Sequence, residues 1–220
     1  MATHMAQRVG IWIIAIVLTV GTLAGFIALI LSPKNQATDQ AKLADLTAQY
    51  QTAQDEYQKK VATQATELSN MYFGTFSPFA SRVGAFDKAS VTQLKTEDLK
   101  IGDGAEIAKD TSFTAYYIGW NPDGVIFDQS IDGTTLKAPF TAQPGGVITG
   151  WSEGVVGMKV GGIRELTIPS DKAYGASGSG DKIGANTPLK FVMMVIPTPT
   201  AIAQPEVPAE LLKYYQRGSF

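Results

Sequence analysis

The stretch that decides the fold is GGVITGWSEGVVGMKVGG, from Gly145 to Gly162. It predicts a helix of about two turns with one large aromatic residue, Trp151, at its start. Gly150 lets the chain turn sharply into this helix, and Gly154 and Gly157 keep its surface low enough for a sheet to lie against it. Such a short helix is not stable alone, because helix nucleation is unfavourable and two turns add little. We therefore expect strands to wrap around it.

Patterns typical of strands and turns surround this helix between Val91 and Pro197. Aromatic residues alternate with other types over Ser112–Trp120, as in a half-buried strand. The tetrapeptide NPDG at residues 121–124 has the composition of a hairpin turn. Strands are expected over Leu94–Leu99, Ala105–Ala108, Ser112–Trp120, Val125–Asp128, Arg164–Ile168 and Phe191–Ile196. Many antiparallel strands with one short helix indicate an α+β fold.

Five motifs in this region follow one another in a fixed order. They are YYIG (116–119), DGVIFD (123–128), VITGWSEGVVGMKVG (147–161), LTIPSDKAYG (166–175) and LKFVMMV (189–195). Together they resemble the FKBP-type peptidyl-prolyl cis-trans isomerases, from Leu94 to Pro197. The resemblance implies a curved antiparallel β-sheet wrapped around the short helix, with a groove between them. It also implies proline-containing polypeptides as substrates and no cofactor.

The resemblance assigns ten residues to the groove. The catalytic residues it implies are Tyr117, Phe127, Asp128, Trp151, Tyr174 and Phe191. The substrate-binding residues it implies are Phe140, Val147, Ile148 and Ile183. In this assignment Trp151 forms the floor, while the N–H of Ile148 and the hydroxyl of Tyr174 hold substrate carbonyls. By periodicity alone the aromatic members would be ordinary core residues and Asp128 a turn residue, so their order within the motifs decides the assignment.

These residue types suit a reaction that needs no nucleophile. Rotation about an X–Pro bond has a barrier of about 18–20 kcal/mol because amide resonance is lost. The twisted amide carries less charge separation than the planar one, so an apolar, ring-lined enclosure disfavours the planar form relative to it. We expect shape and desolvation to provide most of the rate enhancement, as differential binding of the twisted form.

Two positions depart from the family pattern. Ala138 stands where many members carry an aromatic residue, which would open one side of the pocket. In the loop before the last strand, Ile183-Gly184-Ala185 replaces the common Ile-Pro-Pro segment. We expect this loop to be more mobile than in the family, with consequences for inhibitor affinity and substrate selectivity.

Composition excludes several other functions. The formal net charge is −2 and no basic block occurs, so nucleic acid is not an expected partner. The chain has no cysteine, and its single histidine, His4, lies in the N-terminal tail. Catalytic triads and thiolate metal sites are therefore absent from the body of the chain. The scattered carboxylates show no calcium-loop spacing, and we expect neither a metal nor a cofactor.

The N-terminal region predicts a membrane helix. After a tail at residues 1–8, Val9–Leu31 contains no charged residue, and about 20 apolar residues suffice to cross a bilayer. A cleaved signal peptide is the alternative, but its apolar core is usually shorter. Arg8 precedes the helix and mixed charges follow it, which favours a cytoplasmic N-terminus and a single-pass protein with its catalytic domain outside the cytoplasm. The resemblance is to membrane-anchored members of bacterial type.

The remaining segments are expected to connect and flank these parts. Residues 32–70 predict a helical stalk whose narrow apolar stripe lies on a neighbouring surface, or alternatively forms a weak coiled-coil homo-oligomer. Residues 71–90 mix aromatics with Gly and Pro without either period, as in a linker that packs on the next domain. Residues 91–197 form the FKBP-like domain. Residues 198–220 contain a Pro-rich tether and a short helix that we expect to dock on that domain.

These observations lead to one preferred function. The sequence predicts a membrane-anchored peptidyl-prolyl isomerase that assists the folding of extracytoplasmic proteins. A membrane-tethered module or holdase chaperone that binds proline-containing segments with little catalysis is the alternative. A structural tether, in which the domain is only a spacer, is a third.

Overall fold

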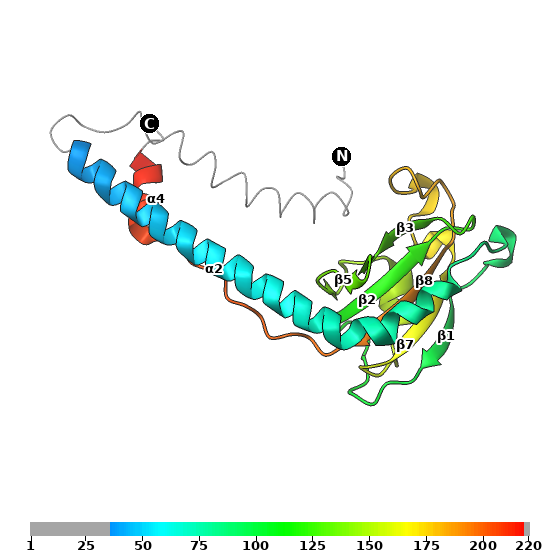
Figure 1. The fold of residues 1–220 in the computed structure, drawn as a ribbon. Helices are drawn as coiled ribbons and strands as arrows, with labels where there is room; N and C mark the ends of the chain where they lie inside the picture. The colour runs from blue at the N-terminus through cyan, green and yellow to red at the C-terminus, as the bar shows by residue number, and fades with distance from the viewer. Residues whose placement is uncertain (1–35, 218–220) are drawn as a thin grey trace. The chain divides into compact units, whose positions relative to one another are not determined.

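The computed structural model describes residues 36–217 in two compact units, which are connected by the long helix α2 (Gln36–Phe76) (Figure 1). The sheet unit comprises residues 63–200, and the helical unit comprises residues 36–62 with 201–217. The predicted tail at 1–8 and membrane helix at 9–31 lie outside the described residues. Between residues 36 and 217, no helix is long and apolar enough to cross a membrane.

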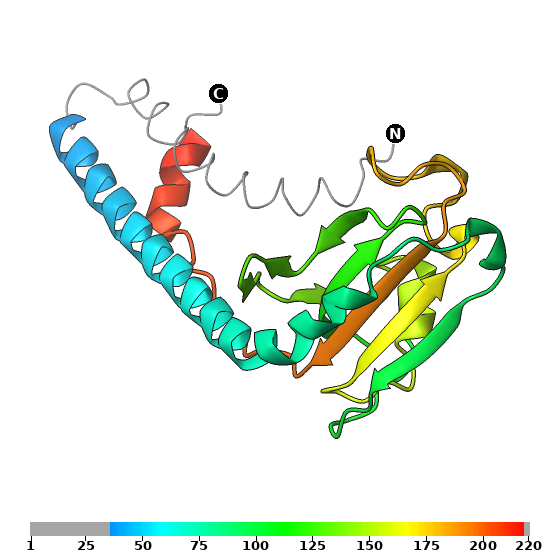
Figure 2. The same cartoon turned by 45° about the vertical axis from the view of Figure 1, so that its right-hand side comes forward.

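The sheet unit is built on one antiparallel sheet with strand order β1-β7-β8-β2-β3, and β6 pairs with the start of β2 (Figure 2). These strands are β1 (Lys95–Lys100), β2 (Phe113–Trp120), β3 (Ile126–Gln129), β6 (Phe140–Ala142), β7 (Ile163–Ile168) and β8 (Leu189–Ile196). A small hairpin, β4 (Ile131–Asp132) and β5 (Thr135–Leu136), lies between β3 and β6. The predicted antiparallel sheet is confirmed, except that residues 105–108 do not form a strand. They pair with residues 157–160 through an isolated bridge, Glu106 to Lys159, and through neighbouring backbone hydrogen bonds.

The short helix α3 (Thr149–Gly154) packs against the inner face of the sheet. Two glycines allow this close contact: a Cβ on Gly150 would lie 2.3 Å from Ile168 Cγ2, and one on Gly154 would lie 2.8 Å from Leu166 Cδ2. Gly157 acts differently from our expectation, because it adopts a φ of 78° in the turn after the helix and a Cβ there would meet no close neighbour. The helix is therefore stabilised by the strands around it, as its length requires.

The outer face of the sheet carries a second core. Its strand residues include Tyr116, Ile118 and Trp120, and the end of α2 covers them through Leu68, Tyr72, Phe73 and Phe76. Phe76 is completely buried, and its ring lies 6.3 Å from that of Tyr116. The helix thus continues to Phe76, beyond the expected end at residue 70, because its last aromatic residues have a surface to cover. The following segment is also partly helical, as η2 (Ser77–Arg82) and η3 (Lys88–Ser90).

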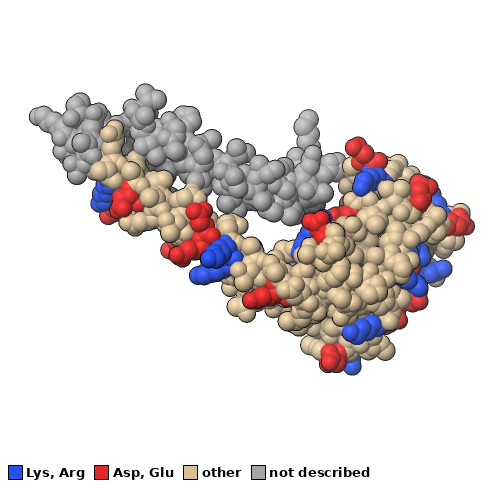
Figure 3. Space-filling view, viewed as in Figure 1, with Lys and Arg blue, Asp and Glu red and all other residues tan. Residues whose placement is uncertain are grey.

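A buried carboxylate fixes η2 to the sheet. Glu165 on β7 is only 4% exposed, and its two oxygens accept hydrogen bonds from Arg82 Nε at 2.7 Å and Lys190 Nζ at 2.8 Å. Arg82 also donates to Glu97 at 2.8 Å. A buried charge is tolerated only when it is paired and hydrogen-bonded, so these cations compensate Glu165. Elsewhere on the face drawn in Figure 3, acidic and basic side chains are interspersed.

The helical unit consists of the first part of α2, the tether and α4 (Ala209–Arg217). Ile202, Pro205 and Pro208 are half-buried while the tether residues between them are exposed, a period of three that is typical of a polyproline II segment. The tether runs antiparallel to α2, since Gln204 Nε2 lies 3.5 Å from Tyr57 Oη and Glu210 pairs with Lys42 at 2.7 Å. The C-terminal helix therefore contacts the first part of α2 within the helical unit, while its expected docking on the sheet domain stays a prediction.

Candidate active site

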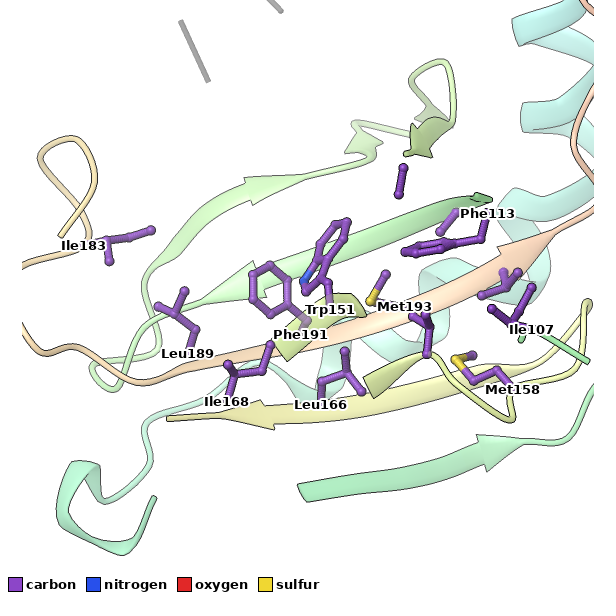
Figure 4. Close-up of a cluster of buried hydrophobic side chains, with 14 residues drawn as sticks. Ile107, Phe113, Trp151, Met158, Leu166, Ile168, Ile183, Leu189, Phe191 and Met193 are labelled. Carbon is purple, nitrogen blue, oxygen red and sulfur yellow. The ribbon is translucent and has the colours of Figure 1, made fainter. Parts of the chain in front are cut away.

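Trp151, in the first turn of α3, lies at the centre of a group of aromatic rings on the inner face of the sheet (Figure 4). Its ring centroid lies 5.0 Å from Tyr117, 5.1 Å from Phe191 and 5.8 Å from Phe140, each at a steep angle. Edge-to-face contacts at such distances are favourable because the positive edge of one ring meets the negative face of another. Strands β2, β6 and β8 thus bring these three rings to the helix, and β2 also brings Phe113, whose ring centroid lies 6.5 Å from that of Trp151.

A second ring pair continues the group along the sheet. Phe127 on β3 contacts Phe191 at 5.4 Å in an edge-to-face arrangement. Gly119 on β2 makes this possible, because a Cβ there would lie 2.5 Å from Phe191 Cε1 and 2.7 Å from Phe127 Cζ. The sequence assignment included both rings but not Gly119. Its position in the YYIG motif was the only indication in the sequence that it belongs to the site.

The aliphatic members of the predicted site pack on the same cluster. Val147 and Ile148 lead into α3 and are half-buried there. Ile183 is only 5% exposed and belongs to the same cluster, although it stands apart from Trp151 at one end of Figure 4. All ten assigned residues thus lie in one region. Tyr117, Phe127 and Phe140 are also half-buried, so part of each ring remains accessible to solvent.

The polar side of the cluster is formed by two phenols and one carboxylate. Tyr117 Oη donates to Asp128 Oδ2 at 2.5 Å, and the N–H of Gln129 donates to Asp128 Oδ1 at 2.8 Å. Burial, together with this hydrogen bond, raises the pKa of Tyr117 well above its usual range. Burial and the charge of Asp128 likewise raise the pKa of Tyr174, which is 36% exposed. Both phenols therefore keep their protons in mildly alkaline solution.

Besides the buried indole N–H of Trp151, two further donors in this region have no protein acceptor within residues 36–217. The N–H of Ile148, immediately before α3, donates no hydrogen bond there, while the carbonyl of the same residue accepts from Trp151 at 3.0 Å. The hydroxyl of Tyr174 has no hydrogen-bond partner in the same range either. A peptide carbonyl is a suitable acceptor for both groups.

The part of the chain that the structure describes offers no alternative chemistry in this region. It contains no group of three or more metal-ligating side chains. Its polar groups near the rings are hydroxyls, one carboxylate and backbone amides. This arrangement can enclose and hydrogen-bond a peptide, but it contains no nucleophile with an adjacent base.

The family described as FKBP-type peptidyl-prolyl cis-trans isomerase matches residues 104–196. An FK506-binding protein of Neisseria meningitidis serogroup B is 45% identical over 98 residues, which are 44% of this chain and 89% of that protein. The chain belongs to the FKBP-type peptidyl-prolyl cis-trans isomerases. The predicted enzyme class is thereby confirmed, and its substrates are proline-containing polypeptides.

Other FKBP proteins match the same part of the chain. FK506-binding protein 4 of Dictyostelium discoideum is 44% identical over 100 residues, which are 44% of this chain but 26% of that protein. A crystal structure of a peptidyl-prolyl cis-trans isomerase from Pseudomonas syringae pv. tomato is 30% identical, covers 63% of this chain and 96% of that one, and has a TM-score of 0.43. The family assignment rests on the sequence relatives.

The FKBP domain also contains a site residue that the motifs did not single out. Ser130 is buried, and its Oγ accepts from the N–H of Tyr117 at 2.9 Å, while its own N–H donates to the carbonyl of Tyr117 at 2.8 Å. These bonds continue the β2–β3 pairing by one residue beyond Ile118 and Gln129, and they fix the backbone of Tyr117. Ala138, the departure from the family pattern, is exposed. The expected mobility of the loop before β8 stays a prediction.

Proposed function

We propose that this FKBP-type isomerase catalyses prolyl rotation at the Trp151 ring cluster, with the ten residues assigned from sequence as its site. The observation that carries the proposal is the convergence of Tyr117, Phe140 and Phe191 on Trp151 at 5.0–5.8 Å. A prolyl ring that is placed against these rings is removed from water, which disfavours the charge-separated planar amide. Uncatalysed rotation takes about 10–100 s, which is slow relative to other folding steps. Enclosure by the rings therefore accelerates a slow step without any covalent chemistry.

The polar groups orient the substrate in this proposal. The free N–H of Ile148 and the hydroxyl of Tyr174 donate to carbonyls on either side of the rotating bond. Asp128 holds the hydroxyl of Tyr117 by its 2.5 Å hydrogen bond, which fixes that ring beside Trp151. These interactions accelerate rotation only if they are stronger in the twisted state than in the planar one.

An isomerisation assay on a proline-containing peptide tests the site with the full-length chain. Trp151→Leu removes the four ring contacts of the indole and should lower kcat/KM at least tenfold. Trp120→Leu is the matched control, because Trp120 is a buried indole in the outer core, and it should stay within threefold while circular dichroism shows a folded chain. Equal losses in both variants would show that stability, and not the ring cluster, sets the rate.

We further propose that the enzyme is a single-pass membrane protein of bacterial type, with the isomerase domain outside the cytoplasm, where it assists the folding of exported proteins. The uncharged stretch Val9–Leu31 and the position of Arg8 support this proposal. The chain lacks cysteine, so single-cysteine variants test it cleanly. An impermeant maleimide added to intact cells should label Ile101→Cys, at a position 76% exposed, and should not label Thr3→Cys. The reverse labelling would overturn this topology.

A further inference from the structure

The loop from Tyr174 to Pro188, between the site and β8, has a defined internal structure. The N–H of Ser179 donates to Ile183 O at 2.8 Å, and the N–H of Asn186 donates to Gly175 O at 2.8 Å. Gly178 adopts a φ of 63° where a Cβ would lie 2.2 Å from Ile183 O, so only glycine fits this closure. The loop is therefore held together by hydrogen bonds between its own residues.

Two hydrogen bonds connect this loop to the β2–β3 hairpin. Asn121 Nδ2 donates to Lys182 O at 3.0 Å, and Lys182 Nζ donates to Ile126 O at 2.9 Å. Asn121 is only 8% exposed, and its Oδ1 accepts from the N–H groups of Asp123 at 3.1 Å and Val125 at 3.0 Å. The side-chain amide of Asn121 thus stabilises the hairpin turn and also binds the loop. Lys182 forms a second, charge-assisted hydrogen bond between the loop and the hairpin.

The residues next to these bonds belong to the ring cluster. Ile126, whose carbonyl accepts from Lys182, directly precedes Phe127. Ile183, which directly follows Lys182, is buried in the same cluster as Phe127 and Phe191. A shift of the loop away from β3 would therefore move Ile183 and remove a support from the strand that carries Phe127.

We propose that Lys182 and Asn121 form a latch that fixes this loop against β3 and so determines how tightly the isomerase binds its proline-containing substrates. Both are positioning residues, since they act through Phe127 and Ile183. The inference rests on the proposed site at Trp151. It assigns a role to a lysine in the segment that departs from the family pattern, where the sequence led us to expect mobility.

Lys182→Met tests the latch in the full-length chain, because methionine keeps an unbranched apolar stem but has no donor. We expect kcat/KM for proline peptides to fall about three- to tenfold, mainly through KM, as one charge-assisted hydrogen bond is lost. Amide hydrogen exchange at Ser179 and Asn186 should accelerate, while exchange at Val192 on β8 stays unchanged. Lys182→Arg should restore both values, since its guanidinium can donate to the same carbonyl.

Lys159→Met is the matched control, because Lys159 is exposed and its side chain makes no hydrogen bond or ion pair within residues 36–217. Asn121→Asp provides a second variant, which keeps the acceptor for the hairpin amides but loses the donor to Lys182 O. It should reproduce the effect of Lys182→Met, and the double variant should add little. Faster exchange at Ser179 without a change in KM would overturn the latch and leave the ring cluster intact. Unchanged activity in Trp151→Leu would instead overturn the site itself.

Discussion

Gly119 shows how a residue without a side chain shapes the active site. It lies on β2 beneath the contact between Phe127 and Phe191, and it has an ordinary strand conformation with no positive φ. Glycine is therefore needed here because it has no side chain, and the two rings occupy the volume that a side chain would fill. Because those rings come from β3 and β8, on either side of β2, a single methyl group at this position would displace both.

Gly119→Ala should reduce activity more than it reduces stability. The new Cβ would lie within 3 Å of both rings, and overpacking of this kind typically costs about 1–3 kcal/mol. We expect kcat/KM to fall at least tenfold, because Phe127 and Phe191 must move from their positions beside Trp151. Peptide isomerisation and urea unfolding measure the two effects. Gly84→Ala, at a position with open space, should change neither, and an active Gly119→Ala enzyme would contradict this account.

Tyr116 gives a prediction about alkaline stability. Its ring is fully buried in the outer core, and its hydroxyl has no hydrogen-bond partner within residues 36–217. Burial raises the pKa of Tyr116 to about 12. The folded chain then keeps this proton while the unfolded chain loses it near pH 10, so stability falls as the pH rises from about 10 to about 12.

Tyr116→Phe should therefore reduce the fall in the free energy of unfolding over that pH range. At pH 7 the variant should be as stable as the parent or slightly more stable, since a buried hydroxyl without a partner is removed. Denaturant unfolding at several pH values measures both effects. Activity at pH 7 should not change, because Tyr116 points away from the ring cluster into the opposite core. An unaltered pH profile would show that the hydroxyl is solvated.

At the scale of elements, the end of α2 belongs to the isomerase domain. Its last turns and η2 cover the outer face of the sheet, and Ser69 Oγ accepts from the N–H of Leu136 on β5 at 2.8 Å. The family match begins only at residue 104. This chain therefore has, besides the shared core around Trp151, a second core that involves residues outside the family region.

Phe76→Ala should destabilise the domain by about 3–5 kcal/mol, because it removes a completely buried ring from this second core. Met71→Ala on the same helix should change stability by less than about 0.5 kcal/mol, since Met71 is 64% exposed. Urea unfolding of the full-length chain compares the two variants. Similar midpoints would mean that the end of α2 does not pack on the sheet in solution.

The two cores differ in how far the sequence predicted them. The sequence located β1, β2, β3, β7, β8 and α3, together with the rings of Tyr117, Phe127, Phe140 and Phe191, because the order of the motifs matched a known pattern. It did not predict β6 or single out Phe113, whose ring lies 6.5 Å from that of Trp151. The outer core escaped prediction although Tyr72, Phe73, Phe76 and Phe79 have the i, i+1, i+4, i+7 spacing of one helix face. Gly74 and Pro78 interrupt this spacing, and the α-helix changes to a 3-10 helix at Ser77, so the segment was interpreted as a linker. The hydrogen bonds of Ser130 and Lys182 were equally hidden, because they join positions that are distant in sequence.

At the scale of the whole molecule, all ten assigned site residues lie in the sheet unit, residues 63–200. A chain that stops after Thr200 should therefore keep its kcat/KM for short peptides within twofold. The same truncation should expose the first part of α2, because it removes the partners of Tyr57 and Lys42. Limited proteolysis should then cut α2 earlier within residues 42–57. A large loss of activity would show that the helical unit contributes to the reaction.

The antiparallel course of the tether has a practical consequence for labelling. It returns the C-terminal helix to the beginning of α2, where Glu210 pairs with Lys42. A fluorophore attached to Leu212→Cys, at a position 45% exposed on α4, would therefore report on the surroundings of Lys42.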